Sequence, residues 1–455
     1  MEKNKKGFMK NFLQKINAKN TYLFLLYSFL FLLPWHSVYI IKERFLNSYK
    51  WQYGSLVFYF SEVVFWFLVI AFIFFNLQRL KSKKIKFWQN RFSRDRIFVV
   101  SIFIFILYLF LNSLWSIDGS VAWQKSLQIL ESIILFLIIL ISAQDKKIMK
   151  NILYVFFLGS LIPAVLGICQ FLLQSTWSSV FLGLGSHPSF QAGASIVGTN
   201  TGRWLRAYGT FEHPNSFAVY LFFVLAIFYF YKQYFSKIFF YLVPIIIMAM
   251  FFTFSRAGFV ALLILFLFAF LELLFKKNQQ KNKNYLFLFN LGLVFVLTII
   301  FLPIWQSRLL INSQNEVQSI SERLSANAEA VEIIKDNFIF GVGPGNYTLA
   351  SYNLNSTRSG WEYQPVHNIY LLFISELGVV GLGLFVLSIY TFLQFCGFWQ
   401  NKLICSKIIV FLFFYLILGL FDHFLFSSYY GVILGGVYFA LLFSVLPLYP
   451  PKVHN

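Results

Sequence analysis

The sequence predicts an all-α membrane protein, a polytopic helical bundle of about twelve transmembrane helices with a partly helical outer loop. Hydrophobic residues make up 59% of the 455 positions and charged residues only 12%, whereas soluble domains carry about 25% charged residues. Apolar runs of about 20 residues, the length of a membrane-crossing helix, recur along the whole chain. This composition excludes a cytosolic enzyme and a disordered or fibrous protein.

Twelve apolar runs mark the expected helices. They lie at about 21–41, 55–77, 97–115, 127–143, 152–174, 215–231, 238–255, 257–275, 285–304, 367–397, 403–420 and 428–448. The tenth run is long enough to require a tilt or an interfacial end. The chain therefore divides into a basic tail at 1–20, five helices in 21–174, an outer loop at 175–214, four helices in 215–304, a large outer loop at 305–366, three helices in 367–448 and a tail at 449–455.

The basic residues set the expected orientation. Most of the 37 Lys and Arg residues fall in the N-terminal tail, in 79–96 and in short turns on the same side. Because cytoplasmic loops are enriched in Lys and Arg, we expect both termini in the cytoplasm and the two long loops outside. This rule explains the net charge of +20 without a nucleic-acid partner. Apolar residues at helical spacing in 1–20 favour a helix on the inner leaflet, with a disordered tail as the alternative.

One apolar stretch, 238–271, contains a single charge, Arg256. As one helix it would be about 51 Å long, too long for a hydrocarbon core of about 30 Å. It would also bury Arg256 in the membrane at a cost of at least about 2.5 kcal/mol. Two helices that turn at 255–258 avoid both problems and place Arg256 at the outer face.

Candidate binding groups gather on the predicted outer face. Its arginines are Arg203, Arg206, Arg256, Arg308, Arg323 and Arg358. Arginine binds phosphate or pyrophosphate through two parallel hydrogen bonds, which lysine cannot do. Arg206 and Arg256 stand at helix ends beside glycine with few acidic neighbours, which favours an anion site. For Arg308, Arg323 and Arg358, pairing with the acidic residues of the 305–366 loop is the stronger interpretation.

His367 opens the tenth run, where the positive end of a helix favours the neutral imidazole that a general base requires. The alternative is that His367 only caps the helix. Asp422-His423, in the last outer turn, could orient a base or bind a sugar, or could simply fill the turn. His187 and His213 are expected to be ordinary loop residues.

The 305–366 loop combines a helical pattern with a glycine-rich turn. Apolar residues at helical spacing predict a helix against the membrane or the bundle: Val317, Ile320, Leu324, Val331, Ile334 and Phe338. Gly341–Gly345 is expected to form a tight turn, because it lacks the Gly-Lys-Ser/Thr of a phosphate-binding loop. No spacing of His, Cys or carboxylates suggests a metal site.

Four tracts in this order resemble the O-antigen ligase/O-antigen polymerase superfamily of polytopic bacterial membrane glycosyltransferases. They are Arg206–Asn215, Ser255–Gly258, Phe340–Tyr347 and His367–Leu371, the last continuing to Gly378. Asp422-His423 is a weaker fifth tract. The resemblance covers about residues 200–430, and the first five helices match only in hydropathy.

The resemblance implies transfer of a glycan from undecaprenyl pyrophosphate to an acceptor hydroxyl on the outer face of the bacterial inner (cytoplasmic) membrane. It implies an inverting reaction without metal, nucleotide or other cofactor. The partners would be the lipid-linked glycan, a lipid, glycan or protein acceptor, and membrane lipids. In the implied roles His367 activates the acceptor and Arg206 and Arg256 bind the pyrophosphate. Possible supporting residues are Asn215, Asn368, Asp422 and His423.

Two other functions stay open. A polymerase that extends an O-antigen or exopolysaccharide would share the same tracts. A lipid-linked glycan transporter or flippase would also fit twelve spans, but transporters place ionisable groups near the membrane midplane. The only candidates for such groups here are Glu62, Glu131 and Glu376.

Overall fold

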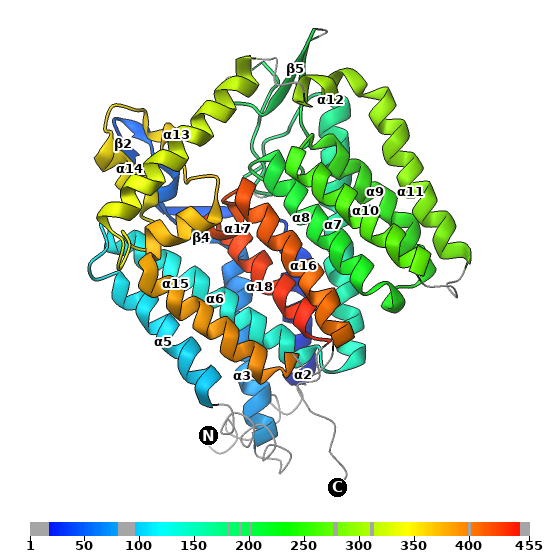
Figure 1. Cartoon of the computed structure of the whole chain (residues 1–455). Coiled ribbons are helices and arrows are strands. Elements are labelled where there is room, and N and C mark those ends of the chain that lie inside the picture. Colours follow the sequence, from blue (N-terminus) through cyan, green and yellow to red (C-terminus); the bar gives the residue numbers. More distant parts are fainter. Residues whose placement is uncertain are drawn as a thin grey trace, which may run out of the picture.

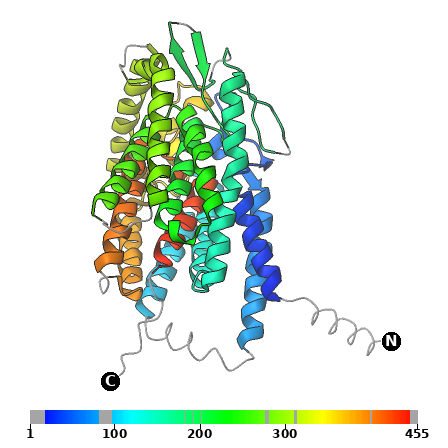
Figure 2. The same ribbon diagram turned by 90° about the vertical axis from the view of Figure 1, so that its right-hand side faces the viewer.

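The computed structural model describes residues 18–80, 96–180, 182–190, 193–200, 202–275, 281–309, 314–398 and 402–445. These residues form a bundle of apolar helices, with strands and shorter helices gathered at one end (Figures 1 and 2). The inner-leaflet helix predicted in residues 1–20 lies outside the described residues, except for 18–20, which begin α2. The C-terminal tail at 449–455 also lies outside them.

Each predicted apolar run overlaps an apolar helix, although the first two runs also contain strands. In chain order these are α2 (Ala18–Leu32), α3 (Phe60–Leu80), α5 (Arg96–Asn112), α6 (Gly119–Ser142), α7 (Lys146–Leu173), α8 (Pro214–Phe230), α9 (Lys237–Phe252), α10 (Arg256–Phe275), α11 (Lys281–Ile300), α15 (Ile369–Phe395), α16 (Lys402–Phe421) and α18 (Tyr429–Phe443). Among the described residues, 5 helices are long and apolar enough to cross a membrane, or 6 with the bent pair at 287–308. The helices support a multi-pass membrane protein, and the number of twelve crossings stays a prediction.

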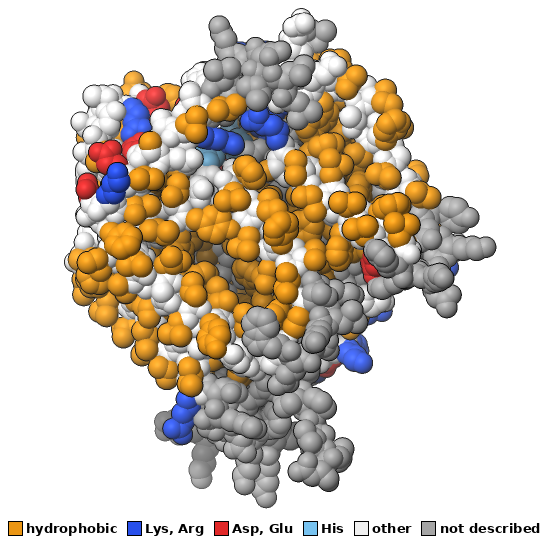
Figure 3. Space-filling view, in the orientation of Figure 1, with side chains coloured by type: hydrophobic (Ala, Val, Ile, Leu, Met, Phe, Trp, Pro, Cys, Tyr) orange, Lys and Arg blue, Asp and Glu red, His pale blue; other side chains and the backbone are white. Residues whose placement is uncertain are grey.

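Helices α8 and α18 form the centre of the bundle. Almost every side chain of both helices is buried, as expected for helices that are apolar on all faces. The outer helices instead expose large apolar side chains, for example Phe67, Ile97 and Leu288. This exposed surface gives the molecule the hydrophobic flank seen in Figure 3, which suits contact with lipid tails.

The first apolar run is not helical throughout, contrary to the expectation of a helix at 21–41. Helix α2 ends at Leu32, and β1 (Val38–Lys42) pairs antiparallel with β4 (Leu56–Tyr59). Between them lie β2 (Phe45–Leu46), β3 (Tyr49–Lys50) and the short helix η1 (Gln52–Gly54). Pro34 stops the helix, and the residues after it favour an extended chain. Hydropathy alone could not distinguish the helical part of this run from the extended part. We call residues 38–59 the strap.

The long tenth run is accommodated by a break in α15. Gly378 has φ 63° and ψ −175° inside the helix, a conformation that favours glycine. The predicted tight turn at 341–345 is confirmed and packs against this break: the N–H of Gly343 donates to the carbonyl of Glu376 at 2.9 Å. A side chain at Gly378 would collide with the carbonyl of Ile339, and one at Gly341 would collide with the carbonyl of Glu376. The close contact between the turn and the break therefore requires glycine at both positions.

The break predicted near 255–258 is confirmed, since α9 ends at Phe252 and α10 begins at Arg256. Phe254, in the turn, has φ 46°, an uncommon conformation for a bulky residue. This turn lies at the same end of the bundle as the strap (Figure 1). The turns after α6 and α8, with Lys146 and Lys232, face the opposite end.

The two long loops contain strands and helices of their own. The first contains the hairpin β5 (Ile196–Thr199) and β6 (Gly202–Leu205), and the second contains α12 (Leu302–Leu309), α13 (Gln314–Asp336), α14 (Tyr347–Leu354) and η4 (Gly360–Glu362). The predicted helix in the second loop is confirmed as α13. Its inward face is Ala330 and Ile333, whereas Leu324 and Val331 are exposed and Phe338 lies beyond the helix.

Candidate functional site

Arg206 is fixed at the junction of the first outer loop, α8 and the α9–α10 turn. Its side chain follows β6 and is only 4% exposed. The guanidinium donates to the carbonyl of Thr253 at 2.6 Å, to Oδ1 of Asn215 at 2.6 Å and to Oγ of Ser195 at 3.0 Å. These three acceptors are uncharged, and together they orient the guanidinium. The contact with Asn215 is compatible with the predicted supporting role of that residue, which stays a prediction.

Arg256 begins α10 close to the same turn. The N–H of Ala207 donates to the carbonyl of Phe252 at 2.9 Å, and Gly258 lies close against Ala218 of α8. The tracts 206–215 and 255–258 are therefore side by side. That the guanidiniums of Arg206 and Arg256 face one cavity stays a prediction.

His213, expected to be a loop residue, caps α8. Its Nδ1 accepts the N–H of Asn215 at 3.1 Å, which leaves the ring proton on Nε2, 3.3 Å from Oγ of Ser195. Part of the ring reaches solvent, but protein surrounds it on several sides. Loss of bulk water, together with the charge of Arg206, lowers the pKa of His213 to about 3.

His367 does not cap α15, so the capping alternative is wrong. The cap is Asn368, whose Oδ1 accepts the N–H groups of Tyr370 at 2.9 Å and Leu371 at 3.2 Å. The ring of His367 instead contacts the ring of His423, with centroids 4.9 Å apart at 72°. Nδ1 of His423 lies 2.6 Å from Oγ of Ser427. Residues 56 positions apart in the chain thus place two imidazoles together.

Asp422 lies among three imidazoles. Burial opposes its ionisation, but interactions with His423, His367 and His213 and the N–H of Phe424 hold the pKa of Asp422 below its usual value. Burial lowers the pKa of His423 to about 3. The turn at 422–423 therefore interacts electrostatically with the other tracts, and its role in orienting a base or binding a sugar stays a prediction.

The pKa of His367 is also lowered, by burial first, while Asp422 opposes the shift and Arg323 adds to it. The expected neutral imidazole is supported, but its main cause is the loss of water around the ring. The sequence argument had relied on the positive end of the helix.

Several residues near the polar cluster were not predicted from the sequence to belong to it. Arg323 of α13, expected to pair with acidic residues, acts electrostatically on both His367 and His423. Glu212 accepts a hydrogen bond from Gln52 at 2.9 Å, and the ring of Tyr53 lies 6.2 Å from that of His423. Glu212 lies within the tract Arg206–Asn215, so the sequence already placed it near Arg206. The strap residues carry no local signal, because only folding brings them here.

Two further polar side chains of the long loops make contacts of their own. Arg358 binds Glu329 at 2.8 Å, as the interpretation of acidic pairing expected. His187 stacks on Tyr208, with centroids 4.5 Å apart. Within the described residues, no group of three or more His, Cys, Asp and Glu has an arrangement that would hold a metal ion. Figure 3 shows histidine surface in a recess between basic side chains, above the hydrophobic flank.

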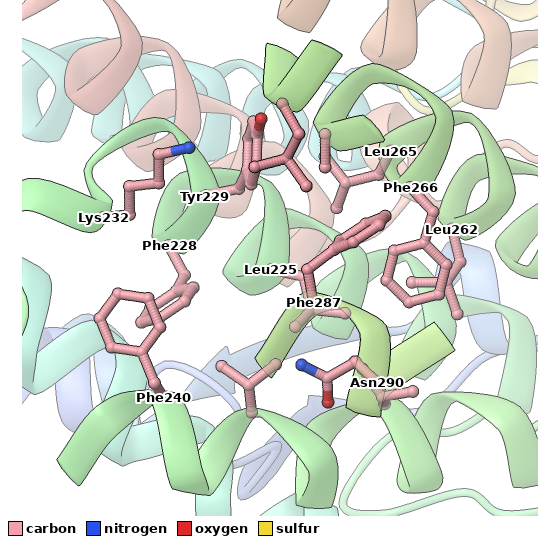
Figure 4. Close-up of a pocket in the computed structure, with 14 residues that line it drawn as sticks. Leu225, Phe228, Tyr229, Lys232, Phe240, Leu262, Leu265, Phe266, Phe287 and Asn290 are labelled. Atoms are coloured by element: carbon pink, nitrogen blue, oxygen red, sulfur yellow. The ribbon is translucent and has the colours of Figure 1, made fainter. Parts of the chain in front are cut away.

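A separate apolar cavity lies between α8, α9, α10 and α11 (Figure 4). Leu225, on its wall, is twelve residues from His213, which is roughly 18 Å along the helix. Its lining is almost entirely aliphatic and aromatic, with Lys232 at one edge and Asn290 at another. Such a wall offers few hydrogen bonds to a pyrophosphate, so the cavity is not part of the polar cluster.

Comparison with known proteins supports the tracts. Residues 240–386 match a family model described as O-Antigen ligase. The match contains Arg256 and His367, whereas Arg206, Asn215, Asp422 and His423 lie outside it. No curated protein matches the chain. Over residues 240–386, the match supports the resemblance to the O-antigen ligase/O-antigen polymerase superfamily that the ordered tracts first indicated.

Proposed function

We propose that this chain moves a glycan from undecaprenyl pyrophosphate to an acceptor hydroxyl on the outer face of the bacterial cytoplasmic membrane. One observation carries the proposal: His367, His423 and Asp422 meet at one end of the bundle, with His213 and Arg206 close by. This arrangement combines a proton acceptor with fixed cations, the two elements that transfer from a pyrophosphate needs.

In the proposed reaction, neutral His367 takes the proton of the acceptor hydroxyl as its oxygen attacks the anomeric carbon. The bond from that carbon to the phosphate oxygen breaks, and its electron pair leaves with undecaprenyl pyrophosphate. Attack from the side opposite the leaving group inverts the anomeric centre. The nearby charge of Asp422 stabilises the imidazolium that forms on His367.

Arg206 and Arg256 would stabilise the negative charge that develops on the leaving pyrophosphate. Arg206 supports this role because three hydrogen bonds hold its guanidinium in place before substrate binds. A fixed donor in a partly dry site costs no reorganisation at the moment of reaction. Two planar forks also match the oxygens of a pyrophosphate better than two ammonium groups.

A lipid-linked glycan transporter is the second candidate. The observation that favours it is the buried pair Glu62 and Glu131, which are 5% and 1% exposed in α3 and α6. Transporters use such intramembrane carboxylates. These residues do not belong to any of the tracts that identify the superfamily.

Reconstitution with labelled undecaprenyl-pyrophosphate glycan tests both candidates. Purified protein in liposomes should release undecaprenyl pyrophosphate and attach the label to the acceptor, with EDTA present as well as without it. Movement of intact donor across the bilayer without cleavage would favour the transporter. Product length then separates a ligase, which adds one glycan, from a polymerase, which builds a ladder.

A further inference from the structure

The strap is anchored firmly across the outer end of the bundle. Arg44 forms an ion pair with Asp118 at the start of α6. Nε1 of Trp51 donates to Oγ1 of Thr348 at 3.1 Å, and Nε2 of Gln124 donates to the carbonyl of Val57 at 2.7 Å. Tyr59, at the end of β4, stacks on Tyr429 of α18, with ring centroids 4.6 Å apart. These anchors belong to α6, α14 and α18, so the strap is held by both halves of the chain.

This anchoring presents Gln52 and Tyr53 to the site. Nε2 of Gln52 donates to Oε2 of Glu212 at 2.9 Å, and the Gln52 side chain is exposed. Tyr53 is half-buried, with its ring edge-on to His423. Its hydroxyl makes no hydrogen bond to any residue that the structure describes. The hydroxyl of Tyr53 is therefore able to donate a hydrogen bond to a ligand. The ring of His423 contacts both Tyr53 and His367.

We propose that Gln52 and Tyr53 form the subsite for the acceptor saccharide, an inference that rests on the proposed function. A sugar offers hydroxyls, which the phenol and the amide can bind, and an apolar ring face that packs on an aromatic ring. Because the ring of His423 contacts the rings of both Tyr53 and His367, a saccharide on Tyr53 would place a hydroxyl near the base.

The charges around Tyr53 favour a neutral sugar over the pyrophosphate. Burial raises the pKa of Tyr53, and the carboxylates of Glu212 and Asp422 raise it further. These carboxylates would repel a pyrophosphate but accept hydrogen bonds from sugar hydroxyls. Arg206 and Arg256 lie instead on the α8–α10 side. The two substrates would therefore approach the base from different sides.

Kinetics on Tyr53→Phe test the subsite. The probes are lipid-linked glycan and acceptor fraction extracted from cells that lack this chain. We expect the acceptor KM to rise about tenfold, the usual effect of one lost hydrogen bond, with the donor KM unchanged. Tyr49→Phe, an exposed tyrosine of the same strap, is the matched control and should behave as wild type. Gln52→Ala should raise the acceptor KM by a smaller factor and serves if Tyr53→Phe fails to fold.

Photo-crosslinking gives a readout that does not depend on turnover. A benzoylphenylalanine at position 53, in a His367→Ala background, should capture acceptor saccharide in cells, and the same probe at position 49 should not. An unchanged acceptor KM in active Tyr53→Phe, or capture of the pyrophosphate lipid at position 53, would overturn the subsite. Absence of any transfer by the wild-type protein would instead reject the proposed function.

Discussion

The two ends of helix α8 treat charge in opposite ways. The C-terminal end is called the inner end, because the lysine pattern predicts that it faces the cytoplasm. There Lys232 binds Glu272 at 2.8 Å and lies over the ring of Tyr229 at 4.5 Å. At the N-terminal end, called the outer end for the same reason, the neutral ring of His213 caps the helix, and the guanidinium of Arg206 donates to three uncharged oxygens. One end is a closed ion pair beside an apolar cavity, and the other is a group of polar side chains from several distant tracts.

The difference shows which charges can act on a substrate. A lysine bound directly to a carboxylate already has its counter-charge and mainly joins helices. Around Asp422, by contrast, three imidazoles share one carboxylate, and a proton added to any of them changes the balance of all. The outer end can therefore respond to a proton or an anion, whereas the inner end is expected to be structural.

Removing the base should have the largest effect. His367→Ala should lower the transfer rate by about 10²–10⁴-fold, the usual contribution of a general base. His367→Gln should fall similarly, because an amide cannot take the proton. Asn368 still caps α15 in both variants, so insertion and donor binding should persist. Near-normal turnover by His367→Gln in the reconstituted assay would remove the base assignment.

Replacing the guanidinium groups of Arg206 and Arg256 should have the second-largest effect on the transfer rate. Arg206→Lys and Arg256→Lys should each lower the transfer rate by about 10²–10³-fold, the loss typical of one preorganised charge-stabilising group. The matched control is Arg358→Lys, because Arg358 is paired with Glu329 away from the cluster. Equal losses in all three variants would show that the effect comes from general destabilisation, and the anion site would then be abandoned.

The pH dependence of the transfer rate should report the protonation of His367 in the polar cluster. Because burial lowers the pKa of His367, the base is neutral above a pH that lies below the ordinary value of about 6.5. The rate should therefore be full at neutral pH and fall only as the pH drops through that lower value. His367→Gln should lose this dependence. A midpoint above about 6.5 in the wild-type protein would contradict a buried neutral base.

The smallest effect is expected at the inner end. Glu272→Gln leaves Lys232 without its carboxylate and should lower the free energy of unfolding by about 1 kcal/mol, since the pair is only partly buried. The transfer rate should not change. Thermal unfolding in detergent and the transfer assay, measured on one preparation, check both statements. A large loss of turnover would mean that the two ends of α8 are coupled.

The sequence determined the helices and the breaks between them, because these depend on local pattern. Runs of apolar residues predicted the long apolar helices, the lone charge of Arg256 predicted the α9–α10 turn, and the glycines predicted the turn at 341–345. Hydropathy failed at the strap, since an apolar extended segment and an apolar helix look alike when only composition is read. The quoted tracts supplied His367 and Arg206 as candidates.

Only the tertiary structure decided which contacts these candidates make. The sequence could not show that Asn368 caps α15, that His213 caps α8, or that Arg323 influences the charge state of His367. It could not bring Tyr53 to His423 across 370 positions. These outcomes depend on contacts between distant segments and on the burial that such contacts produce. Burial, which no single stretch of sequence contains, is the main cause of the lowered pKa of His367.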